Sequence, residues 1–334
     1  FSTCVSHGIV LGADGAKMSK SLRNYPDPMN VFDTYGADAM RWYLLSSSIL
    51  RGSDFAVTEE GIRDTVRQVM LPLWNSWYFL SLYANAEAKT GSIDYSSTNV
   101  LDVYIFSKLH KLVAETTKLM DSYDLFEACQ QVRGFLDALT NWYIRRSRDR
   151  FWAGDQDAIN TLHTTLHVLT RVIAPLLPLT SEKIFRGLTN ERSVHLQTWP
   201  SPDEIPCNND LVTVMDQVRD VCSSTLSLRK VHSRRVRLPL AKLTVASPLA
   251  EGLRPFVSII TDEVNVQEVV LSTDVAGVAR HELQVIPAAL GPRLGSNTQK
   301  VIVAVKKGDW KQTGDTIVAG GVELQPHEFQ LKLM

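Results

Sequence analysis

The sequence predicts a mostly α-helical protein, in which a helical bundle is preceded by a short α/β segment and followed by a small α/β domain. Apolar residues recur at intervals of three or four from residue 58 to residue 226, which is the period of amphipathic helices. Residues 5–11 and several segments after Pro239 are instead short runs rich in β-branched residues, which favour strands. We therefore expect three domains, at residues 1–57, 58–237 and 238–334.

The composition limits the class of protein. A chain of 334 residues with 44% hydrophobic and 21% charged residues is ordinary for a soluble protein of two or three domains. No apolar run reaches the roughly 20 residues that a membrane span needs, so no membrane contact is expected. The net charge of −1 argues against a protein that coats nucleic acid with its whole surface. Any contact with RNA must come from local clusters of cations.

The cysteines and the N-terminus indicate the redox environment of the chain and whether it is part of a larger protein. The four cysteines show no Cys-x-x-Cys pair and no cluster with histidine, so we expect no metal site and a reducing, cytoplasmic setting; they are Cys4, Cys129, Cys207 and Cys222. The N-terminus has no signal-peptide pattern and no initiator methionine. We therefore expect the chain to begin inside a larger protein.

The first candidate site is a loop that carries two lysines, Lys17-Met18-Ser19-Lys20-Ser21. The preceding Gly-Ala-Asp-Gly sequence at 12–15 has the turn geometry of a mobile loop. Lys17 and Lys20 are compact charges with rotatable donors, which suit the oxygens of a polyphosphate, and the two serine hydroxyls add hydrogen bonds. The alternative is a solvated loop without a ligand, which is the commoner role of surface lysines.

Capping residues predict where the first helices begin. Asp27 followed by Pro28 predicts a short helix that Gly36 ends, and a second helix is expected at 37–45. Thr58, followed by two glutamates, predicts the start of a long helix that continues to Leu80. Aromatic residues crowd the second half of that helix, and we expect them in the core; they are Trp74, Trp77, Tyr78 and Phe79.

The remaining elements follow from periodicity, prolines and glycines. Further helices are expected at 103–120, from Leu125, at 158–173, from Thr180 to Gly187 and from Asn209, with an extended segment at 194–200. A strand at 243–246, a helix at 249–260 and a strand at 266–271 predict a parallel βαβ unit. Strands are also expected at 283–286, 316–318 and 329–333 as parts of one small sheet, with a turn at 290–295, and residues 300–305 favour a strand by propensity.

Two basic segments are candidate RNA contacts. In residues 141–152 four arginines alternate with aromatic residues on a predicted helix; they are Arg145, Arg146, Arg148 and Arg150. They can clamp phosphates or stack on unpaired bases, or they can form ion pairs with acids of neighbouring helices, and both interpretations stay open. In residues 229–237 five cations form the densest basic run, which is an RNA contact or a solvated face; they are Arg229, Lys230, Arg234, Arg235 and Arg237.

Several of these segments resemble one family. The lysine loop resembles the KMSKS signature of class I aminoacyl-tRNA synthetases, and the residues that follow it to about position 47 look like the isoleucyl-tRNA synthetase version. Residues 141–152 and 194–200 are also similar to that family. The resemblance implies a helix rather than a strand at 298–307. It also implies that the bundle binds the tRNA anticodon region and that residues 1–57 are the end of a catalytic domain.

The resemblance also implies roles for the lysine loop. The loop would close over ATP, with its Mg2+, during isoleucine activation; Lys20 would stabilise the charge on departing pyrophosphate and Lys17 would support it. The partners implied are isoleucine, ATP and the isoleucine tRNA, and a monomer is expected. The other class I signature is missing, so this segment alone is expected to be inactive. A valyl-tRNA synthetase segment and a stand-alone RNA-binding module are the alternatives, although a binding module has no use for a pyrophosphate-handling loop.

Overall fold

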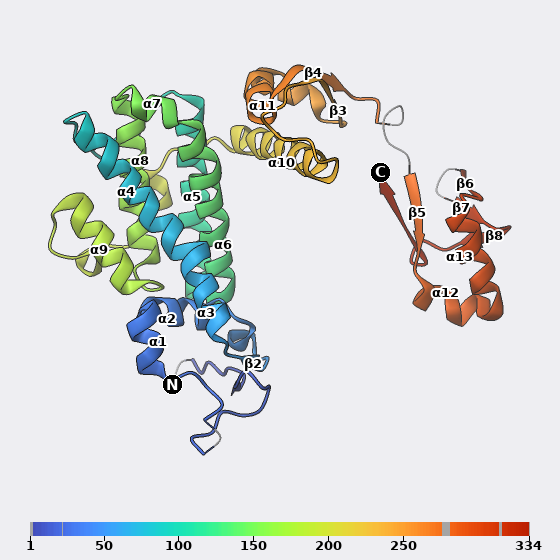
Figure 1. The fold of residues 1–334 in the computed structure, drawn as a ribbon, viewed down its shortest axis with the longest axis horizontal. Coiled ribbons are helices and arrows are strands. Elements are labelled where there is room, and N and C mark those ends of the chain that lie inside the picture. The colour runs from blue at the N-terminus through green and yellow to red at the C-terminus, as the bar shows by residue number, and fades with distance from the viewer. Residues whose placement is uncertain (1–2, 22, 276–280, 314–315, 334) are drawn as a thin grey trace. The chain divides into compact units, whose positions relative to one another are not determined.

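The structure is a computed structural model that describes residues 3–21, 23–275, 281–313 and 316–333, and it is mainly helical, as predicted (Figure 1). The chain divides into two compact units. Unit 1 comprises residues 1–215 and unit 2 comprises residues 216–334. No helix in the described part of the chain is long and apolar enough to cross a membrane.

Unit 1 begins with a two-stranded parallel sheet and two short helices. Strand β1 (Val10–Leu11) pairs with β2 (Phe55–Ala56), so the strand expected at 5–11 is shorter than predicted because its partner has only two residues. The first helices are α1 (Pro28–Tyr35) and α2 (Ala37–Leu45), as predicted. The Asp27 carboxylate caps α1 by accepting the backbone N–H groups of Met29 and Asn30. Gly36 ends α1 with a φ of 85°, which favours glycine.

The bundle of unit 1 is built from helices of different lengths. Its helices are α3 (Glu59–Thr65), α4 (Leu71–Ala86), α5 (Val100–Asp121), α6 (Leu125–Asp137), α7 (Arg148–Trp152), α8 (Gln156–Ile173) and α9 (Pro178–Thr189). Two π-helical segments interrupt them, η2 (Val66–Met70) and η3 (Ala138–Ile144). Short 3-10 helices lie at η1 (Ser48–Arg51), η4 (Val194–Leu196) and η5 (Pro202–Glu204). The 3-10 turn at η4 replaces part of the extended segment predicted at 194–200.

The predicted helix from residue 58 to 80 is one helical run with a π-helical interruption. Pro72 has no N–H, and its ring clashes with the carbonyl four residues before it in a regular α-helix. The Leu71 N–H donates to the carbonyl of Val66, five residues back, which is the π pattern. The local widening therefore lets the helix continue past the proline.

Helix α8 lies at the centre of the bundle. It packs against α4, α5 and α9, and almost every residue from 158 to 173 is buried. Leu162, Leu166 and Leu169 are 0% exposed, as the periodicity predicted. On α4 the prediction of a buried aromatic group is only partly right, because Trp74 is 37% and Tyr78 is 59% exposed.

Helix α9 is capped by a residue of another helix. Its own N-cap residue, Leu177, has no side-chain hydrogen bond to offer. The Asp38 carboxylate on α2, 3% exposed, instead accepts the N–H groups of Leu179 at 3.3 Å and Thr180 at 2.6 Å. The helix begins two residues before the predicted Thr180 and ends at Thr189 rather than at Gly187. The helix continues through Gly187 and ends only where Asn190 adopts the left-handed conformation, with φ 60°.

Helix α10 (Asn209–Val231) crosses the boundary between the units, and unit 2 continues with the predicted βαβ unit. Strands β3 (Leu240–Ala246) and β4 (Val266–Ser272) are parallel, with Leu240 opposite Val266. The connection is a 3-10 helix, η6 (Ala250–Phe256), followed by α11 (Val257–Val264). The predicted single helix is divided near Pro255, which cannot donate the hydrogen bond that a continuous helix needs.

The rest of unit 2 contains two sheets and two helices. Strand β5 (His281–Val285) pairs antiparallel with β9 (Phe329–Leu333), and β6 (Trp310–Thr313), β7 (Thr316–Ala319) and β8 (Val322–Leu324) form a second sheet. The helices are α12 (Pro287–Leu294) and α13 (Thr298–Lys306), joined by η7 (Gly295–Asn297). The predicted turn at 290–295 and the propensity for a strand at 300–305 are therefore wrong, and the helix implied by the resemblance is present. Buried Leu290 and Val301 explain this, because both helices place apolar residues in one core.

Candidate functional site

The lysine loop is a closed turn on the surface of unit 1. The Gly12 N–H donates to the Ala16 carbonyl at 2.8 Å, and Leu11 forms an antiparallel bridge with Lys17. Asn24 fixes the far end of the loop. Its amide nitrogen donates to the Asp14 carboxylate at 3.1 Å, and its side-chain oxygen accepts the N–H of Ser19 at 3.0 Å. The backbone of the loop is thus held in place while its side chains stay available.

The side chains of the loop point to two different environments. Met18 is partly buried and packs against a small core that contains Val31, Ala39, Val57 and Ile62. Lys17, Lys20 and Ser21 are exposed and Ser19 is partly buried, with the two serine hydroxyls 2.7 Å apart. The loop therefore presents two ammonium groups to solvent from a position fixed by an apolar side chain.

Arg150 is held inside a buried polar network. Its guanidinium donates to both oxygens of the Asp102 carboxylate, at 2.7 and 2.8 Å, and to Asp155 at 2.7 Å. Asp102 is 0% exposed and also accepts the hydroxyl groups of Tyr143 at 2.9 Å and Ser97 at 2.6 Å. Burial alone would lower the pKa of Arg150, but the hydrogen bonds to Asp102 and Asp155 outweigh it, and the pKa is raised. Burial next to the Asp102 charge raises the pKa of Tyr143 well above its ordinary value.

The other arginines of residues 141–152 lie in different environments because the segment is not one regular helix. The π-helical η3 ends at Ile144 and α7 begins at Arg148. Arg145 and Arg148 are exposed, and the Nε of Arg145 donates to the Asn141 carbonyl at 2.8 Å. Arg146 is partly buried. Arg145 and Arg148 are therefore the most accessible arginines of this segment.

The basic run at 229–237 also contains one buried arginine. Arg229 is 3% exposed, and its guanidinium donates to the carbonyls of Arg235, Leu238 and Asn265 at 3.0, 3.0 and 2.8 Å. It thereby holds the turn after α10 against the end of α11. The remaining cations of the run are exposed; they are Lys230, Arg234, Arg235 and Arg237.

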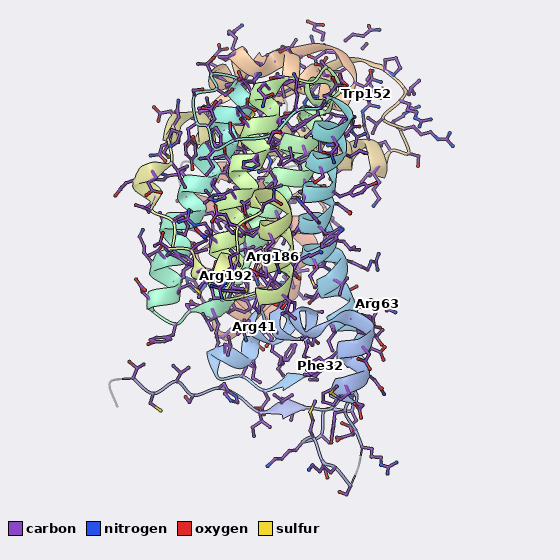
Figure 2. All side chains as sticks on the ribbon, turned by 90° about the vertical axis from the view of Figure 1, so that its left-hand side faces the viewer. Phe32, Arg41, Arg63, Trp152, Arg186 and Arg192 are labelled. Carbon is purple, nitrogen blue, oxygen red and sulfur yellow. The ribbon has the colours of Figure 1, made fainter. Side chains whose placement is uncertain are left out.

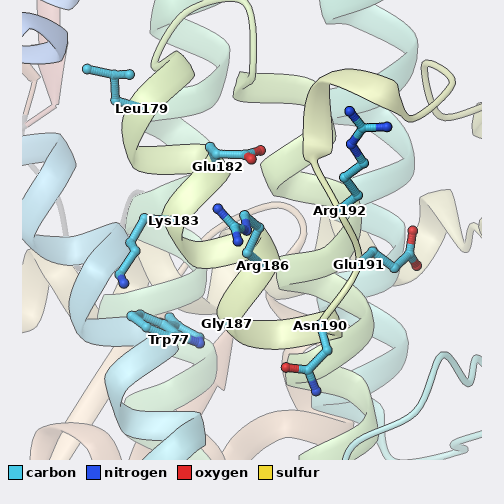
Figure 3. Close-up of a pocket in the computed structure, with 9 residues that line it drawn as sticks. All are labelled: Trp77, Leu179, Glu182, Lys183, Arg186, Gly187, Asn190, Glu191 and Arg192. Carbon is cyan, nitrogen blue, oxygen red and sulfur yellow. The ribbon is translucent and has the colours of Figure 1, made fainter.

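A hollow that sequence reasoning missed lies between α4 and α9 (Figure 3). Its volume is about 510 Å³. The indole of Trp77 forms one wall, and Lys183, Arg186 and Arg192 are among the side chains that line it. The spacing of Lys183 and Arg186, three residues apart on a helix, is the one signal in the sequence. This spacing predicts a site only when it is also known that α9 packs beside α4, and the sequence does not show that packing.

Histidine and cysteine offer no metal site in the described residues, where no group of three or more His, Cys, Asp or Glu side chains is placed to hold an ion. Burial, with the nearby positive charge of Arg171, lowers the pKa of His167 to about 4, so this histidine is neutral at pH 7. Burial raises the pKa of the Cys129 thiol to about 12. Both residues are parts of the core.

Two family models match the chain, one at its N-terminal segment and one over most of the helical bundle. Residues 1–56, which contain the lysine loop, match the family described as tRNA synthetases class I (I, L, M and V). Residues 102–246 match the family described as the anticodon-binding domain of tRNA ligase. The second match contains the arginine-rich segment, α9 and the basic run.

Curated relatives extend the similarity to the whole chain. It is 56% identical over 337 aligned residues to an isoleucine–tRNA ligase of Corynebacterium efficiens, and the alignment covers 100% of this chain. Over its whole length the chain is similar to a segment of isoleucine–tRNA ligases. Those from Nocardia farcinica and Mycobacterium tuberculosis are 55% and 56% identical over 100% of the chain. The chain spans about a third of the length of these isoleucine–tRNA ligases, 32% in each case.

The solved structures that resemble this chain are more distant from it. The Agrobacterium radiobacter K84 LeuRS–tRNA–LeuAMS ternary complex has a TM-score of 0.46 and 22% identity, covering 62% of this chain and 24% of that one. The Mycobacterium tuberculosis methionyl-tRNA synthetase bound to methionyl-adenylate has a TM-score of 0.46 and 21% identity, covering 57% and 39%.

Proposed function

We propose that this chain supplies the ATP-site lysine loop and the tRNA-binding bundle of an enzyme that activates isoleucine with ATP and transfers it to its tRNA. The observation that carries the proposal is the KMSKS loop, with both ammonium groups exposed, in a chain 56% identical over its whole length to an isoleucine–tRNA ligase. In this proposal residues 1–57 end a catalytic domain, residues 58–237 bind tRNA and residues 238–334 form a C-terminal domain. The enzyme is proposed to be a cytoplasmic monomer.

The lysines act on charge. Adenylate formation moves negative charge onto the pyrophosphate that leaves ATP, and a fixed ammonium group beside it lowers the energy of that transition state. We assign this role to Lys20, with Lys17 in support, and hydrogen bonding of phosphate oxygens to Ser19 and Ser21. Mg2+ would enter with ATP and share its phosphate charge. The residues present fit the phosphates of ATP, since no carboxylate of the described chain forms an ion pair with either lysine.

The tRNA contacts are proposed to come from exposed cations. From the arginine-rich segment these are Arg145 and Arg148, and from the basic run they are Lys230, Arg234, Arg235 and Arg237; Arg146 is partly buried. We leave out Arg150 and Arg229, because their donors are used within the protein and a phosphate would have to displace those bonds. Each basic segment thus contains an arginine whose hydrogen bonds are made within the protein and other cations that are exposed to solvent.

The lysine role is tested by Lys20→Ala in the full-length enzyme that contains this chain. The rate of isoleucine-dependent pyrophosphate exchange should fall by roughly a hundredfold or more, the usual effect of removing one group that stabilises a transition-state charge. The Kd for tRNA should stay within about twofold. Arg23→Ala, which removes another exposed cation near the loop, is the matched control. Exchange at the wild-type rate would remove the proposed role of Lys20.

The choice of amino acid and the alternatives are tested with the same enzyme. Pyrophosphate exchange with isoleucine should exceed that with valine, and the opposite preference would assign the chain to a valine enzyme. A parent protein that binds tRNA but exchanges pyrophosphate with neither amino acid would be the RNA-binding module.

A further inference from the structure

The hollow between α4 and α9 has a rigid apolar wall. The Trp77 ring is packed edge-on against Trp74, with ring centroids 5.0 Å apart. On its other side it touches α9 at Gly187, where a Cβ would lie only 2.3 Å from Cζ2 of the indole. Glycine at 187 is therefore required for this close approach, and two contacts hold the indole in place. The wall is formed before any ligand arrives.

Three exposed cations are also among the residues that line the hollow. Lys183 and Arg186 lie three residues apart on α9, so their Cβ atoms are about 5–6 Å apart on one face of the helix. Arg192 comes from the loop after α9, and all three side chains are exposed (Figure 2 labels Arg186 and Arg192). In the described part of the chain, none of these three side chains has an ion pair or hydrogen bond. Their donors are available to a ligand.

The carboxylates at the hollow are used for another purpose. The Oε2 of Glu182 accepts the Ser193 hydroxyl at 3.0 Å and the Val194 N–H at 2.8 Å. The Oε2 of Glu191 accepts the side-chain amide of Gln197 at 2.7 Å. These bonds fix the loop after α9. Neither carboxylate forms an ion pair with any of the three cations in the described residues. With three cations and two carboxylates among its lining residues, the hollow is positive overall.

We propose that this hollow binds a backbone phosphate of the tRNA, with the adjoining sugar or base against the Trp77 indole. Arginine and lysine without acidic partners favour phosphate oxygens, and an aromatic wall favours a nucleotide over a bare anion. The ligand is RNA because α9 and its loop lie within the residues that match the anticodon-binding family. The inference rests on the proposed function and adds a site outside both basic segments. A phosphate contact positions the RNA and does not read its sequence.

The test is a titration of this chain with isoleucine tRNA, followed by fluorescence anisotropy at several salt concentrations. The neutral variant carries Lys183→Gln, Arg186→Gln and Arg192→Gln. It should bind about tenfold or more weakly, and the slope of log Kd against log salt should fall by about 0.7 to 1, the change expected when one phosphate contact is lost. A charge-retaining variant, with Lys183→Arg, Arg186→Lys and Arg192→Lys, should bind within about threefold of the wild type, because point charges suffice for phosphate.

The matched control removes three cations elsewhere on the same unit, by Arg63→Gln, Arg67→Gln and Lys118→Gln. Each of these is exposed and forms a pair with an acid three residues away. The control should leave the salt slope nearly unchanged. A neutral variant with the wild-type Kd and slope, beside a wild-type chain that binds tRNA, overturns this inference and leaves the proposed function standing. A wild-type chain that binds no tRNA overturns both.

A second comparison separates phosphate binding from base recognition. The ratio of the Kd values for isoleucine tRNA and for a tRNA with an altered anticodon should be the same in the wild type and in the neutral variant. A changed ratio would mean that the hollow reads a base, and the assignment to a backbone phosphate would fail. Circular dichroism should show equal melting temperatures, because the three side chains are exposed and unpaired in the described residues.

Discussion

Arg150 and Arg148 are two residues apart and have opposite roles. Arg150 forms a two-pronged ion pair with Asp102, whose carboxylate has no contact with solvent. Arg148 is exposed. Removing the cation that pairs with a buried carboxylate leaves a negative charge in a poorly solvated place, which costs stability. Removing an exposed arginine changes stability little, because its charge is already hydrated. Neighbouring arginines of one cluster therefore contribute to different properties of the protein.

This difference gives a prediction for stability. Arg150→Ala should lower the free energy of unfolding by about 3–5 kcal/mol, because it leaves Asp102 buried without its partner. Arg148→Ala, the matched control, should change it by less than about 0.5 kcal/mol. Urea unfolding followed by circular dichroism measures both. Equal effects of the two substitutions would contradict the assignment of Arg150 to the core network.

The sequence could not predict which arginines are structural. Asp102 is 48 residues from Arg150, and the Asn265 carbonyl is 36 residues from Arg229. The local pattern of charges does not show whether folding brings such a distant partner next to the arginine. The lysine loop was easier to predict, because turn glycines and lysines close together in the chain determine most of its geometry. The Asn24 bonds that fix it were not anticipated.

At the scale of elements, helix α9 depends on helix α2 for its beginning. The first N–H groups of a helix need an acceptor, and the residue before α9 is a leucine. Asp38 supplies that acceptor, and the Arg41 guanidinium on the same helix donates to the Pro175 carbonyl at 2.8 Å. Two side chains of α2 thus bind the segment where α9 starts. The helix that lines the hollow is therefore positioned by α2, which follows the lysine loop in the chain.

Removing this cap should be measurable. Asp38→Ala should lower the free energy of unfolding by about 1 to 2 kcal/mol, the usual effect of losing an N-cap. Asp38→Asn should cost less, because the amide oxygen still accepts a hydrogen bond. Thermal unfolding compares the two variants, with exposed Asp64→Ala as the control. A control that destabilises as much as Asp38→Ala would argue against the cap.

Element prediction succeeded where periodicity and caps agree, and failed where proline acts within a helix. The bounds of α2, the cap at Asp27 and the parallel β3–β4 pair were all predictable. Residues 290–295 were predicted as a turn that resembles a family motif, yet they lie mostly in α12. There the burial of Leu290 outweighs the local preference for a turn. The hollow at α9 needed the pairing of two helices, which no single segment encodes.

On the scale of the whole molecule, charge is distributed unevenly. The chain has a net charge of −1, yet it has local groups of exposed cations at the basic run, the arginine-rich segment and the hollow. A surface that is neutral overall avoids indiscriminate binding of polyanions, while local clusters hold one partner. The affinity for tRNA should therefore depend strongly on salt and on a limited number of side chains.

The basic run gives the corresponding prediction. Arg234→Ala, Arg235→Ala and Arg237→Ala together should weaken tRNA binding and reduce the salt slope by about 2 to 3. The melting temperature should not change, since all three side chains are exposed. Arg229→Ala is the contrasting variant: it should lower the melting temperature, because three backbone carbonyls lose their donor. An unaltered Kd and slope in the triple variant would make the run a solvated face.

Met18 links the positions of the two lysines of the loop to one apolar contact. Its thioether chain is inserted among apolar side chains, and a lysine stands one residue before it and another two residues after it. Withdrawal of this one side chain would displace both amines together. Under the proposed function, the two lysines would therefore move together when ATP binds and when pyrophosphate leaves.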